Sequence, residues 1–147
     1  MLKRFQMSDA NSVSTPCELN LHLQASDSSL LSERDPQVVR DYQQAVGSCM
    51  FLTVFTRGDC AFAVNQCARL MSNPGPTHVA AICRVLRYLT GTRSLGITNR
   101  RSTGTIANQL WVTADADHAG ADDRRSVSRR AVLMAGAMVN GPPKDSP

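Results

Sequence analysis

The sequence lacks the long apolar stretches of an exported or membrane-spanning protein. No apolar run among its 147 residues approaches the roughly 20 residues that a membrane-spanning helix needs. The charged start Met1-Leu2-Lys3-Arg4 is not followed by the apolar stretch of a signal peptide. We therefore expect an intracellular protein, in the cytoplasm or the nucleus, with no membrane partner.

Aromatic residues and paired cysteine motifs are also scarce. Aromatic side chains make up 5% of the chain against 42% hydrophobic residues, which predicts a folded protein with an aliphatic core. The five cysteines include no Cys-x-x-Cys pair, and their odd number favours reduced, mostly buried thiols. A zinc site can be drawn from Cys60, Cys67, His78 and Cys83, but it would pull its ligands off predicted helix core faces.

Acidic residues are absent between Cys60 and Ala114, a stretch that holds six arginines. These are the candidate nucleic-acid-binding residues: Arg69, Arg84, Arg87, Arg93, Arg100 and Arg101. Only two residues of the chain are lysines, so arginine carries nearly all the positive charge. Because a guanidinium group binds phosphate through two donors, a nucleic-acid backbone is one expected partner. A solvated basic surface is the other interpretation, and charge alone leaves both open.

Three helices joined by short loops are predicted over residues 34–93, and this pattern favours a small helical bundle. The first begins at Asp35-Pro36, with the aspartate as N-cap and the proline at the first helical position, and runs to about Val54. The second follows Asp59, which can cap it, and stops at the turn Asn73-Pro74-Gly75-Pro76.

The third predicted helix, residues 76–93, has an apolar face and a basic face. Its apolar residues recur at spacings of three and four: Val79, Ile82, Cys83, Leu86 and Leu89. The same winding places Arg84, Arg87 and Tyr88 on another face, and Gly91 suits the C-terminal cap. The apolar face would join this helix to a core, which leaves the arginine face for an anionic partner.

After the third helix the pattern changes to the short apolar runs of strands, so the predicted fold class is α+β with helix dominant. Strands are predicted at four runs, separated by polar segments such as 122–130: residues 95–98, 110–114, 131–134 and 137–139. The predicted organisation has an irregular lead-in, a helical region, an incomplete antiparallel β hairpin or sheet, and a disordered tail. These parts span residues 1–33, 34–93, 94–141 and 142–147.

Carboxylates stand out in the segment Ala114-Asp115-Ala116-Asp117-His118-Ala119-Gly120. An aspartate at a strand end can ligate a hard cation such as Mg²⁺, and two such ions held by several carboxylates drive phosphodiester hydrolysis. Asp-x-Asp before glycine is also a common turn former. His118 can be a base or an ordinary surface histidine.

Several motifs, in matching order and spacing, resemble the copia-type retrotransposon polyprotein. They are Tyr42-x3-Val46-Gly47-Ser48-x-Met50-Phe51-Leu52-Thr53, Thr56-Arg57-x-Asp59-x-Ala61-Phe62-Ala63-Val64-Asn65-Gln66, Arg69-x-Met71-Ser72-x-Pro74, Arg84-Val85-Leu86-Arg87-Tyr88-Leu89-x-Gly91-Thr92 and Asp115-Ala116-Asp117-x-Ala119-Gly120. The similarity covers nearly the whole chain. It implies the thumb and connection of a reverse transcriptase, leading into the first strands of an RNase H domain.

The resemblance also implies partners and a site. The second and third helices would help to hold an RNA–DNA template–primer, beside the remainder of the polyprotein. Asp115 would match the first Mg²⁺-binding carboxylate of RNase H. The polymerase Tyr-x-Asp-Asp segment and the other RNase H acids have no match here, so we expect a truncated copy that is inactive alone.

Local departures from the family pattern also indicate a degenerate copy of the element. Arg-Pro-Asp is replaced by Arg57-Gly58-Asp59, His-Trp by His78-Val79, and Ser-Gly-Tyr by Ser128-Arg129-Arg130. Two other hypotheses remain open. The chain can be a small helical protein–protein interaction module derived from the element, or a nuclease that another chain completes.

Overall fold

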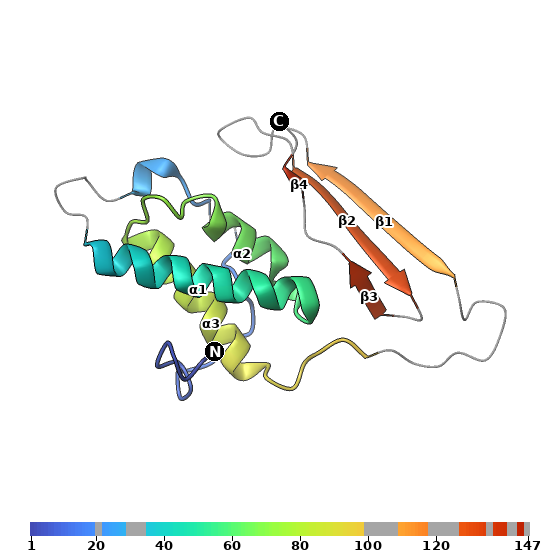
Figure 1. Ribbon diagram of the computed structural model, residues 1–147, viewed down its shortest axis with the longest axis horizontal. Helices are drawn as coiled ribbons and strands as arrows, with labels where there is room; N and C mark the ends of the chain where they lie inside the picture. The colour runs from blue at the N-terminus through green and yellow to red at the C-terminus, as the bar shows by residue number, and fades with distance from the viewer. Residues whose placement is uncertain are drawn as a thin grey trace. The chain divides into compact units, whose positions relative to one another are not determined.

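The structure is a computed structural model, and the chain in it forms two compact units. It describes residues 1–19, 22–28, 35–98, 109–117, 127–134, 137–140 and 144–145. The helical unit comprises Met1–Thr53 and Asp59–Leu95, and the sheet unit comprises Val54–Gly58 and Gly96–Pro147 (Figure 1). Within the described ranges, none of the helices is both long enough and apolar enough to cross a membrane.

The first helix, α1 (Pro36–Phe55), begins where its sequence predicts. The Gln37 amide donates a hydrogen bond of 2.8 Å to the Asp35 carboxylate. Asp35 therefore caps one of the amides that a helix start leaves without a helical partner. The proline at the first helical position has no amide to satisfy.

The second helix is shorter than its sequence pattern predicts. A short 3-10 helix, η3 (Gly58–Cys60), leads into α2 (Ala61–Ala68). The α-helix ends at Ala68 and turns follow over residues 69–72, so the helix stops several residues before the predicted stop at Asn73. The Tyr42 hydroxyl donates to the Cys67 carbonyl oxygen at 2.8 Å, so one of the carbonyls at the end of α2 finds its partner on α1.

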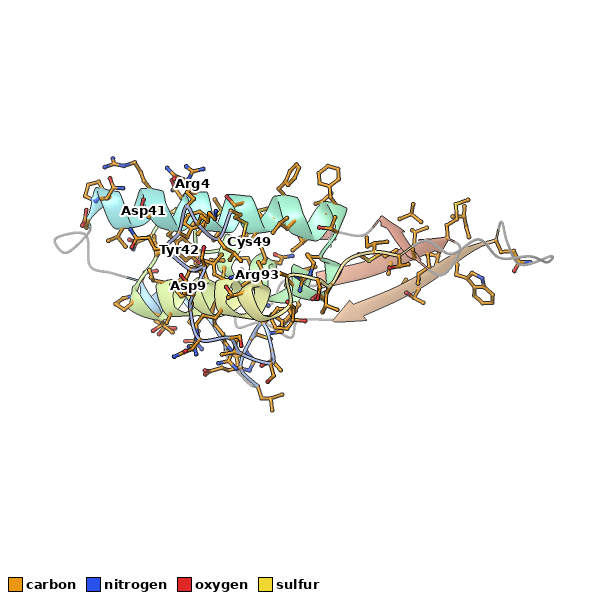
Figure 2. All side chains as sticks on the ribbon, turned by 90° about the horizontal axis from the view of Figure 1, so that it is seen from below. Arg4, Asp9, Asp41, Tyr42, Cys49 and Arg93 are labelled. Atoms are coloured by element: carbon orange, nitrogen blue, oxygen red, sulfur yellow. The ribbon has the colours of Figure 1, made fainter. Side chains whose placement is uncertain are left out.

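The third helix, α3 (Pro76–Gly91), packs with α1 and α2 around one aliphatic core. Figure 2 shows Tyr42 and Cys49 on the side of α1 that faces α3. The core residues are Tyr42, Ala45, Val46, Cys49, Cys60, Ala63, Val64, Cys67, Ala81, Ile82, Val85, Leu86 and Leu89. Of the predicted apolar face of α3, Val79 and Cys83 are only half-buried, whereas Ala81 and Val85, which that prediction did not include, are buried.

The lead-in belongs to the helical unit. Its apolar side chains pack against the core from outside the three helices: Leu2, Phe5, Met7, Cys17 and Leu23. A 3-10 turn, η1 (Ala25–Asp27), ends this described stretch near the start of α3. The lead-in has irregular backbone, as its sequence predicts, but it contributes to the packing of the bundle.

The prediction of reduced, mostly buried thiols is confirmed for the cysteines. All five are free, and Cys49, Cys60 and Cys67 are buried. Burial raises the pKa of Cys49 to about 12 and that of Cys67 to about 11. In the part of the chain that is described, no group of three or more histidine, cysteine or acidic side chains suits a metal ion.

The sheet unit is antiparallel and contains β1 (Leu110–Asp117), β2 (Val127–Met134) and β3 (Ala137–Asn140), in that order. A short strand, β4 (Lys144–Asp145), also pairs with β2. Helices and an antiparallel sheet in one chain confirm the α+β class.

Three predictions about the strands need correction. Residues 95–98 form no strand, because the Leu95 amide donates to the Thr92 carbonyl at 3.1 Å and continues the turn after α3. β2 begins at Val127, inside the predicted polar segment, since it pairs with the full length of β1 and places Arg129 opposite Asp115. Lys144 and Asp145 lie in the predicted disordered tail, yet they pair with the first two residues of β2.

Candidate nucleic-acid interface

The arginines of α3 are brought together as their spacing predicts. Arg84 and Arg87 are three residues apart on one face, and Arg93 follows two residues after the helix ends at Gly91. Arg69 lies on another element, in the turn after α2. Arg100 and Arg101 lie outside the described residues.

A segment of the lead-in runs along the arginine face, antiparallel to α3. We call this segment, residues 7–19 and 22–27, the strap. Figure 1 shows its dark-blue start near the C-terminal end of α3, and its 3-10 turn η1 lies where α3 begins. The strap was not foreseen from the sequence, which indicates only an irregular lead-in.

Arg84 holds the middle of the strap through two different donors. Its Nη1 donates to Glu18 Oε1 at 3.0 Å, and its Nη2 donates to Thr15 Oγ1 at 3.1 Å. The Arg84 side chain is 24% exposed and that of Glu18 is 60% exposed, so solvent weakens this ion pair. Among the described residues, the buried Arg84 Nε has no hydrogen-bond partner.

The other two arginines of this face bind neutral oxygens. Arg87 Nε donates to the Asn11 carbonyl oxygen at 2.7 Å, and Arg93 Nη2 donates to the Ser8 carbonyl oxygen. Between them, Thr90 Oγ1 donates to the Met7 carbonyl oxygen at 2.8 Å. Because carbonyl groups carry no net charge, these contacts leave the two guanidinium charges uncancelled.

The strap also approaches both ends of α3 closely. A Cβ atom added at Gly91 would lie 2.7 Å from Ser12 Cβ, and one added at Gly75 would collide with the Asp27 backbone. Gly91 is the last helical residue, and Thr92 occupies the C-cap position that the sequence assigned to Gly91. Glycine at this position therefore serves close packing of the strap.

His78 fixes the η1 end of the strap from inside the helical unit. Its side chain is fully buried, at 0% exposure. Nδ1 accepts a hydrogen bond of 2.8 Å from the Gly75 amide, so the ring proton lies on Nε2, which is 3.0 Å from the Gln24 carbonyl oxygen. His78 is the third residue of α3 and accepts from the N-cap amide, as Glu or Gln does in a capping box. Both ring nitrogens are thus occupied without a metal.

The candidate carboxylates lie in the sheet unit. Asp115 and Asp117 are in β1, where Asp115 lies opposite Arg129 and Asp117 opposite Val127 in the backbone register. β2 places no acidic residue directly opposite either aspartate. Because a two-metal site needs several carboxylates, the role of Asp115 in binding Mg²⁺ stays a prediction. His118 lies outside the described residues.

The chain is similar to retrovirus-related Pol polyproteins of transposons. The chain is 37% identical over 144 residues to the retrovirus-related Pol polyprotein from transposon TNT 1-94 of Nicotiana tabacum, covering 95% of this chain and 10% of that protein. It is 36% identical over 123 residues to the Pol polyprotein from transposon RE1 of Arabidopsis thaliana, covering 84% and 8%. No family model and no solved structure matches.

A shorter relative carries a different name. The chain is 42% identical over 100 residues to the secreted RxLR effector protein 161 of Plasmopara viticola, covering 67% of this chain and 68% of that protein. An Arg-x-Leu-Arg sequence also occurs here, at Arg84-Val85-Leu86-Arg87. In this chain it is a turn of α3, with Leu86 in the core at 2% exposure.

These similarities define a segment of a retrotransposon polyprotein. The chain belongs to the copia-type retrotransposon Pol family, as its motifs predict. It spans about a tenth of the length of the TNT 1-94 and RE1 polyproteins that it matches.

Proposed function

We propose that the chain contributes to the binding of an RNA–DNA template–primer duplex and catalyses no chemical step alone. The observation that carries the proposal is the row of Arg84, Arg87 and Arg93 along α3, in a stretch of sequence without acidic residues. Two of the three guanidinium groups keep an uncancelled charge, because their partners are carbonyl oxygens. The Pol relatives support a nucleic acid as the anionic partner.

Phosphate is a better partner for these groups than the oxygens that they now contact. A guanidinium group donates two parallel hydrogen bonds to one phosphate, and both are strengthened by charge. Each phosphate that is neutralised also releases counterions, so the affinity falls steeply as the salt concentration rises. Duplex binding through this face should therefore depend strongly on salt.

The test compares the wild type with Arg84→Ala plus Arg87→Ala, using a fluorescent RNA–DNA hybrid at several salt concentrations. We expect the variant to bind about tenfold more weakly at low salt, and to reduce the slope of log affinity against log salt by about 1.8. The matched control is Arg4→Ala plus Arg40→Ala, which removes the same charge from exposed positions whose side chains bond to Gln44 and Gln37.

The control must retain most of the affinity, and thermal unfolding must show that both variants stay folded. Arg84→Lys plus Arg87→Lys is a further check, because lysine keeps the charge without the two-donor geometry. We expect it to bind with intermediate affinity and with the wild-type salt slope. Equal affinity of the wild type and the double alanine variant would refute the proposal.

A second candidate function, protein–protein interaction, has one observation in its favour. Large apolar side chains at spacings of one, three and four are exposed along α1: Met50, Phe51, Val54 and Phe55. Such a row is typical of helices that contact another protein. A gel shift with the RNA–DNA hybrid separates the candidates, because a protein-interaction module would shift no nucleic acid at low or at moderate salt.

A further inference from the structure

The strap and the helix that it covers are complementary in charge. Residues 7–27 of the sequence include Asp9, Glu18 and Asp27 and no lysine or arginine. Residues 76–93 include the three arginines of the face and no acidic residue. The strap thus offers α3 what a nucleic-acid backbone would offer, a line of oxygen acceptors with negative charge.

The strap satisfies only some of the hydrogen-bond donors and charges of the arginine face. Arg84 binds two separate side chains and leaves its buried Nε unpaired in the described part of the chain. A single phosphate can accept from Nε and one terminal nitrogen together, which would satisfy the donor that the strap leaves. Arg87 and Arg93 would likewise exchange a carbonyl oxygen for a charged one.

The η1 end of the strap and its middle are held by different contacts. At the η1 end, Gln24 bonds to the fully buried His78, and the Asp27 backbone lies against Gly75. In the middle, Asn11, Thr15 and Glu18 are exposed, and their contacts with the arginines are exposed as well. Detachment of residues 7–18 from α3 would break these exposed contacts and withdraw the half-buried Met7 and Cys17 from the edge of the core, while residues 24–27 stay in place.

We propose that residues 7–18 compete with a nucleic-acid backbone for Arg84, Arg87 and Arg93. Binding of a duplex then displaces this part of the strap, and the strap lowers the affinity of the free protein for nucleic acid. The inference rests on the proposed function, since it concerns the regulation of the same arginine face.

The first test removes the one carboxylate of the strap that pairs with Arg84. Glu18→Gln keeps the size of the side chain and lowers its attraction to the guanidinium group. We expect the variant to bind the RNA–DNA hybrid about two- to fivefold more tightly than the wild type, in keeping with a solvent-exposed ion pair. The control Asp41→Asn removes one negative charge from α1, where Asp41 accepts a hydrogen bond of 2.8 Å from the neutral Gln37 amide, and should change the affinity less.

The second test follows the strap itself through Cys17. This thiol lies in the strap and is half-buried, beside the buried Cys67 in a small apolar cavity. A Cys83→Ser background removes the other half-buried thiol. We expect saturating RNA–DNA hybrid to increase the alkylation rate of Cys17 several-fold, because displacement of the strap uncovers it.

The outcomes separate the two proposals. If the wild type binds the hybrid, Glu18→Gln binds no more tightly, and Cys17 is alkylated no faster, then competition is refuted and the proposed function stands. If neither protein binds the hybrid, both proposals are refuted. Tighter binding by Glu18→Gln together with faster alkylation of bound Cys17 supports competition.

Discussion

Replacing His78 with alanine is expected to destabilise the helical unit more than any surface change discussed above. The ring is fully buried and joins three parts of the unit: α3, the turn before it and the strap. Its removal leaves the Gly75 amide and the Gln24 carbonyl oxygen without this partner. It also leaves a space that the surrounding side chains fill only in part.

The magnitude comes from the buried Gly75 amide and from the space that the ring leaves. A buried donor that loses its partner costs about 1–3 kcal/mol, whereas the carbonyl oxygen of the exposed Gln24 keeps the Asp27 amide as a donor at 3.1 Å. We therefore expect His78→Ala to lower the free energy of unfolding by about 2–4 kcal/mol, out of the roughly 5–15 kcal/mol of a typical domain.

Two conservative variants divide this loss between the two hydrogen bonds. An asparagine oxygen at position 78 can occupy the place of Nδ1, so His78→Asn should retain the bond from Gly75. A glutamine amide can reach the place of Nε2, so His78→Gln should retain the bond to Gln24. Both should lose less stability than His78→Ala, and His78→Asn should lose less than His78→Gln because it keeps the buried Gly75 amide satisfied.

The assay is urea unfolding followed by far-UV circular dichroism, which reports the helices. Hydrogen exchange at the Gly75 amide provides an independent readout, and this amide should lose its protection in His78→Ala and His78→Gln but keep it in His78→Asn. A loss below about 1 kcal/mol in His78→Ala would refute the reasoning, because that is less than one unsatisfied buried group costs.

Two further predictions concern packing and pH. Alanine has a helix propensity about 1 kcal/mol better than glycine, yet Gly91→Ala should lower the stability, because its Cβ would lie 2.7 Å from Ser12 Cβ. Ser12→Gly should rescue the variant in a double-mutant cycle of urea unfolding, and additive effects of the two changes would contradict this contact. Stability should also fall at alkaline pH, since burial raises the pKa of Cys49 from 9.0 to about 12 and that of Cys67 from 9.0 to about 11. The unfolded thiols release their protons from about pH 9, so this stabilisation is complete below pH 9 and is lost as the pH rises toward 11 and 12. Urea midpoints that do not decrease between about pH 8 and pH 10.5 would contradict the burial of these thiols.

Local signals in the sequence were enough to place most of the helices. Asp35 and Pro36 fix the start of α1 through a side-chain acceptor and a missing amide, and both effects depend only on residue type. Pro76 acts in the same way for α3. The end of α2 was missed because no glycine or proline marks it in the sequence. The Cys67 carbonyl oxygen there accepts from the Leu70 amide and, through a tertiary contact, from the Tyr42 hydroxyl.

The strap could not be predicted for a related reason. Many of its hydrogen bonds end on backbone carbonyl oxygens, such as those of Met7, Ser8 and Asn11. Every residue has such an oxygen, so the sequence gives no pattern to follow. Helical spacing places Arg84 and Arg87 on one face, but it gives no sign of the segment that covers them.

In the β region, the sequence pattern missed the start of a strand. The start of β2 was missed because Arg129 and Arg130 made the segment look like a polar loop. The backbone of this segment forms a strand because it pairs with the whole length of β1. That pairing becomes visible only when two distant segments are aligned.

The position of the strap in the chain has a consequence for synthesis on the ribosome. Ser8 contacts Arg93, which is 85 residues further along the chain. At about 5–20 residues per second, the strap is therefore made roughly 4–17 s before its helix exists. During that interval its apolar residues Met7, Cys17 and Leu23 lack the part of the core that α3 supplies, from Ala81 to Leu89. The last helix to be synthesised is the one that ends this exposure, so a ribosome that stalls between α2 and α3 would leave the start of the chain open to chaperones and proteases.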